Sequence, residues 1–178
     1  MIENFSKAAN DIFDEVIKKY HIKDNIDQEI QNPYKDTLPA LLFSKCFIDS
    51  VQWHVEDLVR DPEINPEKGL EYKRLIDSLN QKRTDTVEKI DDYFIEHFSN
   101  IKAKKEAKLN TESPAWAIDR LSILALKIYH MYQETIRTDI DELKKNQCIN
   151  KYNLLLEQRS DLSQSIDELL SDIKSGKE

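Results

Sequence analysis

Apolar residues recur along the chain at the three- and four-residue spacing of amphipathic helices, and no segment reads as a strand. This pattern predicts an all-α protein. The expected helices cover about residues 2–20, 37–61, 65–101, 113–137 and 139–173. We therefore expect a single-domain antiparallel helical bundle over residues 1–178, with an N-terminal helix followed by a core bundle at about residues 37–173.

Local signals mark several of these boundaries. Thr37, Asn65 and Ser113 are residues that favour the N-cap position, and each is followed by a proline in the first helical turn. The second helix ends before Pro62, because the residue that precedes a proline resists the α conformation. The chain has only two glycines and five prolines, too few turn residues for a β-rich fold.

An internal repeat is one interpretation of the helix order. A shift of 76 residues places His54 on His130 and Arg83 on Arg159, and it pairs the second and third helices with the fourth and fifth. Two pseudo-symmetric αα-hairpins would then follow the N-terminal helix. The few identities leave this interpretation open.

Charge and cysteine usage narrow the functional classes. The net charge of −8 disfavours nucleic-acid binding, because an acidic surface repels phosphates. No apolar run is long enough to span a membrane, and the acidic N-terminal stretch does not resemble a signal peptide. Cys46 and Cys148 are the only cysteines, which is typical of free thiols in a reducing cytoplasm. We expect a cytoplasmic protein without nucleic-acid or membrane partners.

The second helix carries a histidine on its apolar side. His54 falls among apolar residues in the helical projection, with Asp57 and Asp61 on its flank, so we expect His54 to point inward with a carboxylate beside it. The opposite side is predicted to face water. The apolar residues are Phe43, Phe47, Val51 and Leu58, and the water-facing ones are Lys45, Asp49, Gln52 and Glu56.

Polar residues also interrupt the apolar sides of the other core helices. Arg83 and Arg159 each lie in an apolar seam, and a buried guanidinium must be paired. Asp57 and Asp61 are the expected partners. The mostly apolar fourth helix has one polar stripe, formed by Asp119, His130, Glu134 and Arg137, with Lys127 beside it.

Three interpretations of these polar residues remain open. A divalent metal could be held by His54, Asp57, His130 and Glu134, with Asp85 or Glu88, because facing helices of a bundle can supply such ligands. A phosphate ligand could be held by Arg60, Arg74, Arg83 and Arg120. The acids Glu56, Asp57, Glu88 and Asp91 would then hold magnesium, in part of the pattern of the helical nucleotide pyrophosphatases. The third interpretation is a buried ion-pair network that sets helix register in a non-catalytic interaction protein.

Three segments resemble an uncharacterised bacterial family that is described only as a domain of unknown function. They are WHVEDLVRDP at 53–62, KRLIDSLNQKRTDTVEKID at 73–91 and NTESPAWAIDRLSILALKIYHM at 110–131. The resemblance implies an all-helical cytoplasmic bacterial protein and carries no established activity. Val55 stands where this family often has a glutamate.

These observations lead to one hypothesis and leave the enzymatic status open. We expect a polar site between the second, third and fourth helices that binds a small anionic ligand, with a divalent metal as an optional cofactor. Histidines would be base or ligand, carboxylates would orient them and arginines would clamp the anion. The candidate residues are His54, Asp57, Arg83, Asp85, Asp119, Arg120, His130 and Glu134. A protein partner, or a dimer that exchanges the N-terminal helix, is the alternative.

Overall fold

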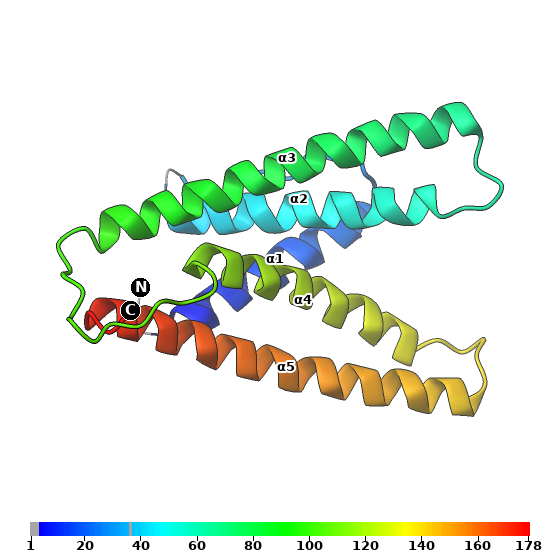
Figure 1. Cartoon of the computed structure of the whole chain (residues 1–178). Coiled ribbons are helices and arrows are strands. Elements are labelled where there is room, and N and C mark those ends of the chain that lie inside the picture. The colour runs from blue at the N-terminus through cyan, green and yellow to red at the C-terminus, as the bar shows by residue number, and fades with distance from the viewer. Residues whose placement is uncertain (1–3, 36) are drawn as a thin grey trace.

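Five α-helices form the protein in a computed structural model that describes residues 4–35 and 37–178 (Figure 1). No strand occurs among these described residues, so the prediction of an all-α protein of five helices is confirmed. The helices are α1 (Phe5–Lys23), α2 (Leu38–Val59), α3 (Pro66–His97), α4 (Pro114–Thr135) and α5 (Glu142–Lys174).

The helices are arranged as two antiparallel hairpins that diverge from one another. In Figure 1, α2 lies along α3 and α4 lies along α5, while α1 crosses behind both pairs. The hairpins are close together at one end and separate toward the 60–65 and 136–141 connectors. Because α1 packs against α2, α4 and α5, it joins the two hairpins.

The hairpins also match in length. Helices α2 and α4 each have 22 residues, while α3 has 32 and α5 has 33. Each hairpin therefore consists of a shorter and a longer helix in the same order, as the interpretation of an internal repeat predicts.

Helix starts are stabilised partly from within and partly from a neighbouring helix. Asn65 accepts hydrogen bonds from the first backbone N–H groups of α3, as its sequence position predicts. Ser113 and Thr37 do not cap their own helices through their side chains. Instead, Asp91 of α3 accepts hydrogen bonds from the Ser113 hydroxyl (2.7 Å) and the Ala115 N–H (3.3 Å) at the start of α4.

The main apolar core joins all five helices. Its fully buried side chains include Phe13 of α1, Leu42 of α2, Ile90 of α3, Leu121 of α4 and Ile166 of α5. A second cluster, formed by Tyr20, Val51, Val55, Ile76 and Leu79, fills the space between α1, α2 and α3. Burial of this apolar area is the main term that stabilises the bundle.

The prediction that Lys45 and Asp49 face water is wrong. Lys45 is 0% exposed and Asp49 is 2% exposed, while Leu58, predicted to be buried, is 41% exposed. Lys45 and Asp49 lie against α3 and α4, which supply the opposite charges of Arg83 and Asp119. Periodicity shows that a helix face is polar, but it does not show whether water or another charged side chain covers that face.

Among the described residues, no helix combines the length and the apolar character that crossing a bilayer requires.

Candidate metal centre

Three histidines from three helices meet where α1, α2 and α4 come together. His21 lies in the last turn of α1, His54 in α2 and His130 in α4. One ring nitrogen of each lies within 4.8 Å of those of the other two. The ring centroids are 5.2 Å apart for His21 and His54, 5.2 Å for His21 and His130, and 5.6 Å for His54 and His130.

Backbone hydrogen bonds set the orientation of two of these rings. Nδ1 of His21 lies 2.7 Å from the Ile17 carbonyl oxygen, and Nδ1 of His54 lies 2.9 Å from the Ser50 carbonyl oxygen. Because a carbonyl oxygen only accepts, each Nδ1 donates a proton and each Nε2 is the ring nitrogen left for another partner. This arrangement is typical of metal-binding histidines, whose second nitrogen donates to a backbone carbonyl.

Two of the Nε2 atoms have no other partner. Nε2 of His21 and Nε2 of His130 are buried and make no hydrogen bond to any described residue. A buried polar atom left unsatisfied costs about 1–3 kcal/mol. Two such atoms in one cluster therefore point to a ligand that the protein itself does not supply.

Asp24 places a carboxylate beside two of the three histidines. Its Oδ1 lies 2.8 Å from Nε2 of His54 and 4.0 Å from Nε2 of His21. An imidazolium could donate to both the Ser50 carbonyl and the Asp24 carboxylate, whereas a neutral ring has one proton and could donate to only one of them. A metal ion between Nε2 and Oδ1 would satisfy both, since nitrogen and oxygen ligands bind zinc at about 2.0–2.2 Å.

The backbone at Asp24 is left-handed. Its φ of 50° and ψ of 48° end α1, and its N–H donates to the Tyr20 carbonyl oxygen at 3.1 Å. Left-handed non-glycine residues cost free energy and gather at functional sites, although aspartate tolerates this region better than most residues. The conformation holds the carboxylate beside His54, and 56% of the Asp24 side chain remains exposed.

Aromatic rings enclose the histidines on their other sides. Trp53 stacks on His130 with a centroid distance of 4.8 Å and an interplanar angle of 5°. Tyr129 lies 4.1 Å from His21, and Tyr20 lies 4.9 Å from His54. This apolar shell limits the contact of the rings with water.

Burial within this aromatic shell also affects the protonation of the histidines. Burial and the neighbouring imidazoles of His21 and His54 lower the pKa of His130 to about 4. Burial likewise lowers the pKa of His21. Both rings are therefore neutral at neutral pH, which is the form that coordinates metals.

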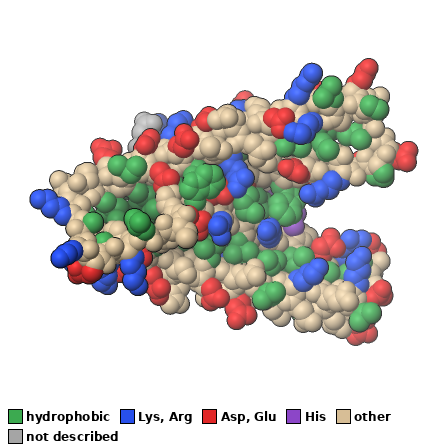
Figure 2. Space-filling view, viewed as in Figure 1, with side chains coloured by type: hydrophobic (Ala, Val, Ile, Leu, Met, Phe, Trp, Pro, Cys, Tyr) green, Lys and Arg blue, Asp and Glu red, His purple; other side chains and the backbone are tan. Residues whose placement is uncertain are grey.

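A cleft of about 470 Å³ opens beside His130. Lys127 of α4 and Lys151 of α5 line it with Trp53, Asp57 and Glu134, and neither lysine forms an ion pair with a described residue. Figure 2 shows the notch between the two hairpins, with a histidine at its inner end and basic side chains near its edges.

The structure brings together only part of the predicted metal set. His54 and His130 meet as expected, but Asp57 and Glu134 do not join them. Asp57 pairs with Arg60 at 2.8 Å and Glu134 pairs with Arg137 at 3.0 Å, both at the surface. The expectation that Asp57 points inward beside His54 is wrong, because 53% of its side chain is exposed.

Arg83 and Asp119 belong to a separate buried cluster. Nε of Arg83 donates to Oδ1 of Asp119 at 2.8 Å, and Nζ of Lys45 lies 2.9 Å from the same oxygen. Lys45 also binds Asp49, whose Oδ2 accepts from the Ser122 hydroxyl at 2.6 Å. An ion-pair network is therefore present, but Arg83 pairs with Asp119 and not with the predicted Asp57 or Asp61.

The pKa values of the two carboxylates in this network shift in opposite directions. Burial raises the pKa of Asp49 and outweighs the attraction of Lys45. Burial also acts to raise the pKa of Asp119, but hydrogen bonds from Arg83 and the charge of Lys45 lower it overall. Asp119 is thus the better paired of the two.

The remaining predicted residues lie elsewhere. Arg120 is exposed and pairs with Glu112 at 3.0 Å, and Asp85 is exposed and accepts from Gln81 at 2.7 Å. The acids of the pyrophosphatase-like pattern are also dispersed, because Asp91 binds the start of α4. Among the described residues they form no group able to share a metal.

His21 and Asp24 were missed in the sequence. They lie just beyond Tyr20, the last apolar position of the first predicted helix, where α1 continues to Lys23. The available signal was the His-x-x-Asp spacing at 21–24, which places both side chains on one side of a helix end.

The fold and the histidine cluster thus define a five-helix bundle with a candidate metal centre at the junction of its hairpins. Residues 39–178 match the family model described as "Protein of unknown function (DUF4254)", and the chain belongs to this family. Comparison with curated proteins gave no match, and comparison with solved structures gave none either. His54 and His130 lie within the matched segment, whereas His21 and Asp24 precede it.

Proposed function

We propose that the protein binds a divalent transition metal of the zinc class through His21, His54 and His130, with Asp24 as a fourth ligand. The observation that carries this proposal is the convergence of one ring nitrogen from each of three histidines within 4.8 Å, together with the buried Nε2 atoms of His21 and His130, which have no hydrogen-bond partner among the described residues. Imidazole nitrogens with one carboxylate favour zinc, cobalt or nickel over magnesium or calcium.

The geometry needs only a small adjustment to hold an ion. Zinc binds imidazole nitrogens at about 2.0–2.1 Å in a tetrahedral arrangement, so bound nitrogens are roughly 3.3–3.5 Å apart. The nitrogen–nitrogen distances would shorten by at most about 1.5 Å from their upper limit of 4.8 Å. Rotation of Asp24, which is largely exposed, would open or close the fourth position.

The cleft beside His130 supports the further proposal that this metal acts on an anionic ligand. Lys127 and Lys151 would attract the anion from two facing helices, and Trp53 would pack against its apolar part. A zinc-class ion with an open position acts as a Lewis acid toward an oxygen of such a ligand. This combines the metal and the small anionic ligand that the sequence led us to expect.

The setting of this function is also a proposal. We propose that the protein works in the bacterial cytoplasm, because both cysteines are free and buried, as in reducing compartments. The net charge of −8 opposes a nucleic-acid partner. A dimer that exchanges α1 would be seen by light scattering coupled to size-exclusion chromatography.

Cobalt titration tests the metal proposal directly. Protein freed of metal with a chelator is titrated with Co²⁺, whose visible absorption reports nitrogen coordination, and then with Zn²⁺ in competition. We expect one equivalent to bind to the wild type and Zn²⁺ to displace it. His54→Gln and His130→Gln should each weaken binding at least tenfold.

His97 provides a matched control, because it is exposed at the end of α3 and lies outside the histidine cluster. His97→Gln should bind Co²⁺ as the wild type does. Equal binding by His54→Gln and the wild type, with both folded by circular dichroism, would falsify the proposal.

A non-catalytic bundle is the second candidate, and the buried network of Lys45, Asp49, Arg83 and Asp119 favours it. In that case the histidines only pack against Trp53 and Tyr129. Loss of stability in His54→Gln without any metal binding by the wild type would support this structural function.

A further inference from the structure

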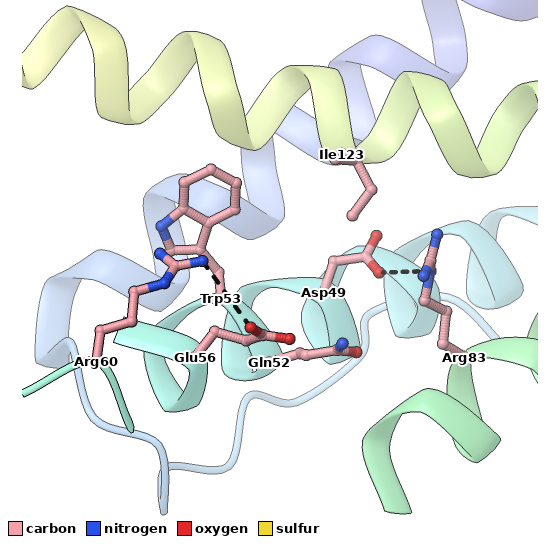
Figure 3. A pocket seen from close by; sticks show the side chains of 7 residues that line it. All are labelled: Asp49, Gln52, Trp53, Glu56, Arg60, Arg83 and Ile123. Carbon is pink, nitrogen blue, oxygen red and sulfur yellow. Dashed lines mark ion pairs between the residues drawn. The ribbon is translucent and has the colours of Figure 1, made fainter. Parts of the chain in front are cut away.

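A second cavity, of about 250 Å³, shares Trp53 with the cleft beside His130 and is lined by residues of three helices (Figure 3). The residues that line it are Asp49, Gln52, Trp53, Glu56 and Arg60 of α2 and its C-cap, Arg83 of α3 and Ile123 of α4. The cavity is much larger than one water molecule needs.

The floor of this cavity carries a buried carboxylate oxygen without a hydrogen bond. Asp49 is 2% exposed, and its Oδ2 is occupied by Ser122 and Lys45. Its Oδ1 accepts no hydrogen bond from a described residue, and Nε of Arg83 is 3.7 Å away. Figure 3 shows Asp49 at the cavity, linked only to Arg83 among the residues drawn.

Gln52 adds a second acceptor of the same kind. Its Nε2 donates to Asn80 at 2.9 Å, which fixes the amide, while its Oε1 is buried without a partner among the described residues. A ligand in the cavity would therefore be expected to donate hydrogen bonds to Oδ1 of Asp49 and Oε1 of Gln52.

Donors are also available on the cavity wall. Arg83 uses Nε and Nη2 to bind Asp119, and no hydrogen bond of its Nη1 to a described residue is present. Arg60 is 70% exposed in its side chain and pairs with Asp57 and Glu56. A ligand would be expected to offer an acceptor, such as a carboxylate, toward these guanidinium groups.

The charge of the lining narrows the ligand class. Two acids, Asp49 and Glu56, face two bases, Arg60 and Arg83, so the lining is balanced. A ligand with both a donor group and an acceptor group would satisfy Oδ1 of Asp49 and Nη1 of Arg83 together, whereas a simple cation or anion would satisfy only one of them. A molecule that carries both charges on neighbouring atoms would complement both.

We propose that this cavity binds a small zwitterion of the amino-acid class, with its ammonium group at Asp49 and Gln52 and its carboxylate at Arg83. Trp53 and Ile123 supply the apolar wall for the rest of the molecule. The proposal is independent of the metal centre, since neither the histidines nor Asp24 line this cavity.

Calorimetry and thermal unfolding with defined probes test it. Glycine and the common L-amino acids are screened one at a time. Methylammonium, acetate and glycerol are the partial probes, which carry only the ammonium group, only the carboxylate or only neutral hydroxyl groups. We expect at least one amino acid to bind and raise the Tm by a few degrees near saturation, and the three partial probes to have no effect.

A blocking variant identifies the location. Ile123→Phe adds volume to the cavity wall without touching the ion-pair network, and it should weaken binding at least tenfold. Ile95→Phe, the same change at a position that is 69% exposed on α3, is the matched control and should bind as the wild type. Asp49→Asn should also abolish binding. If the substitution of this buried residue prevents folding, Ile123→Phe still tests the location of the site.

His54→Gln separates this proposal from the metal proposal, because amino-acid binding should persist in it. The proposal is overturned by a screen without binding, by glycerol or acetate binding more tightly than any amino acid, or by unchanged binding in Ile123→Phe.

Discussion

Lys45 and Asp49 are held in the core by charges that come from other helices. Lys45 contacts both Asp49 and Asp119, and Arg83 completes the group, so two positive and two negative side chains share one buried volume. The net charge is balanced, yet removing one member leaves its partner charged and unpaired. At the residue scale this makes the network the most sensitive point of the bundle.

Lys45→Met should lower the free energy of unfolding by about 3–5 kcal/mol, because Asp49 and Asp119 would lose a buried cation. Urea denaturation followed by circular dichroism measures this loss. Lys45→Met combined with Asp49→Leu should be less destabilised than the sum of the single variants. A loss below about 1 kcal/mol in Lys45→Met would show that water reaches the network.

Cys46 should be inert in the folded protein. It is 0% exposed, burial raises the pKa of its thiol, and its Sγ lies 3.7 Å from the Phe13 carbonyl oxygen. Since the thiolate is the reactive form, iodoacetamide should label Cys46 only after unfolding. Mass spectrometry of a Cys148→Ser variant measures the rate, and equal labelling with and without denaturant would contradict the expectation.

At the scale of elements, residues at equivalent positions of the two hairpins have the same structural roles. His54 and His130 meet in the histidine cluster. Asp91 of α3 binds the start of α4, and Asp167 of α5 binds the start of α1, where it accepts from Ser6 N (2.9 Å) and Ser6 Oγ (2.6 Å). Asp91 and Asp167 thus each accept hydrogen bonds from a serine hydroxyl and from a backbone N–H. The equal placement supports a duplicated hairpin.

Asp91→Asn and Asp167→Asn should each lower the free energy of unfolding by about 0.5–2 kcal/mol, the usual range for a lost helix cap. The two losses should add, because the residues serve different helix starts. Asp161→Asn, on the exposed side of α5, is the matched control and should have almost no effect. Chemical denaturation of the wild type, the two single variants, their double variant and Asp161→Asn measures these changes.

The helices could be predicted well from their period and caps, and the inward direction of His54 could be predicted from its apolar neighbours. The partners of the polar residues could not. Lys45 and Asp49 follow the same spacing as a water-facing stripe, and only the packing of α3 and α4 shows otherwise. His21 and Asp24 lie past Tyr20, the last buried apolar position of α1, where periodicity carries no information.

At the scale of the whole molecule, the histidine cluster joins α1 to both hairpins through one residue each. A bound ion would therefore tie three separate helices together and oppose their separation during unfolding. Ligands that bind only the folded state stabilise it in proportion to the logarithm of their concentration. The metal should thus act on the stability of the entire bundle.

Zn²⁺ at a hundredfold excess over its dissociation constant should stabilise the wild type by about 2.7 kcal/mol and raise its Tm by several degrees. Mg²⁺ should not, because it prefers oxygen ligands. His21→Gln should lose the response while His97→Gln keeps it. Differential scanning calorimetry with and without chelator measures the shift, and a response to Zn²⁺ that survives in His21→Gln would place the ion elsewhere.

Trp53 stacks on His130 and also lines the cavity of Asp49. A ligand in either site would influence the position of the Trp53 ring, which the other site also contacts. If both proposed ligands bind and each shifts this ring, their affinities would be linked, and linkage is reciprocal: the factor by which the metal changes the affinity for the zwitterion would equal the factor by which the zwitterion changes the affinity for the metal. Through this one indole, the concentration of either ligand in the cell would then change the affinity of the protein for the other.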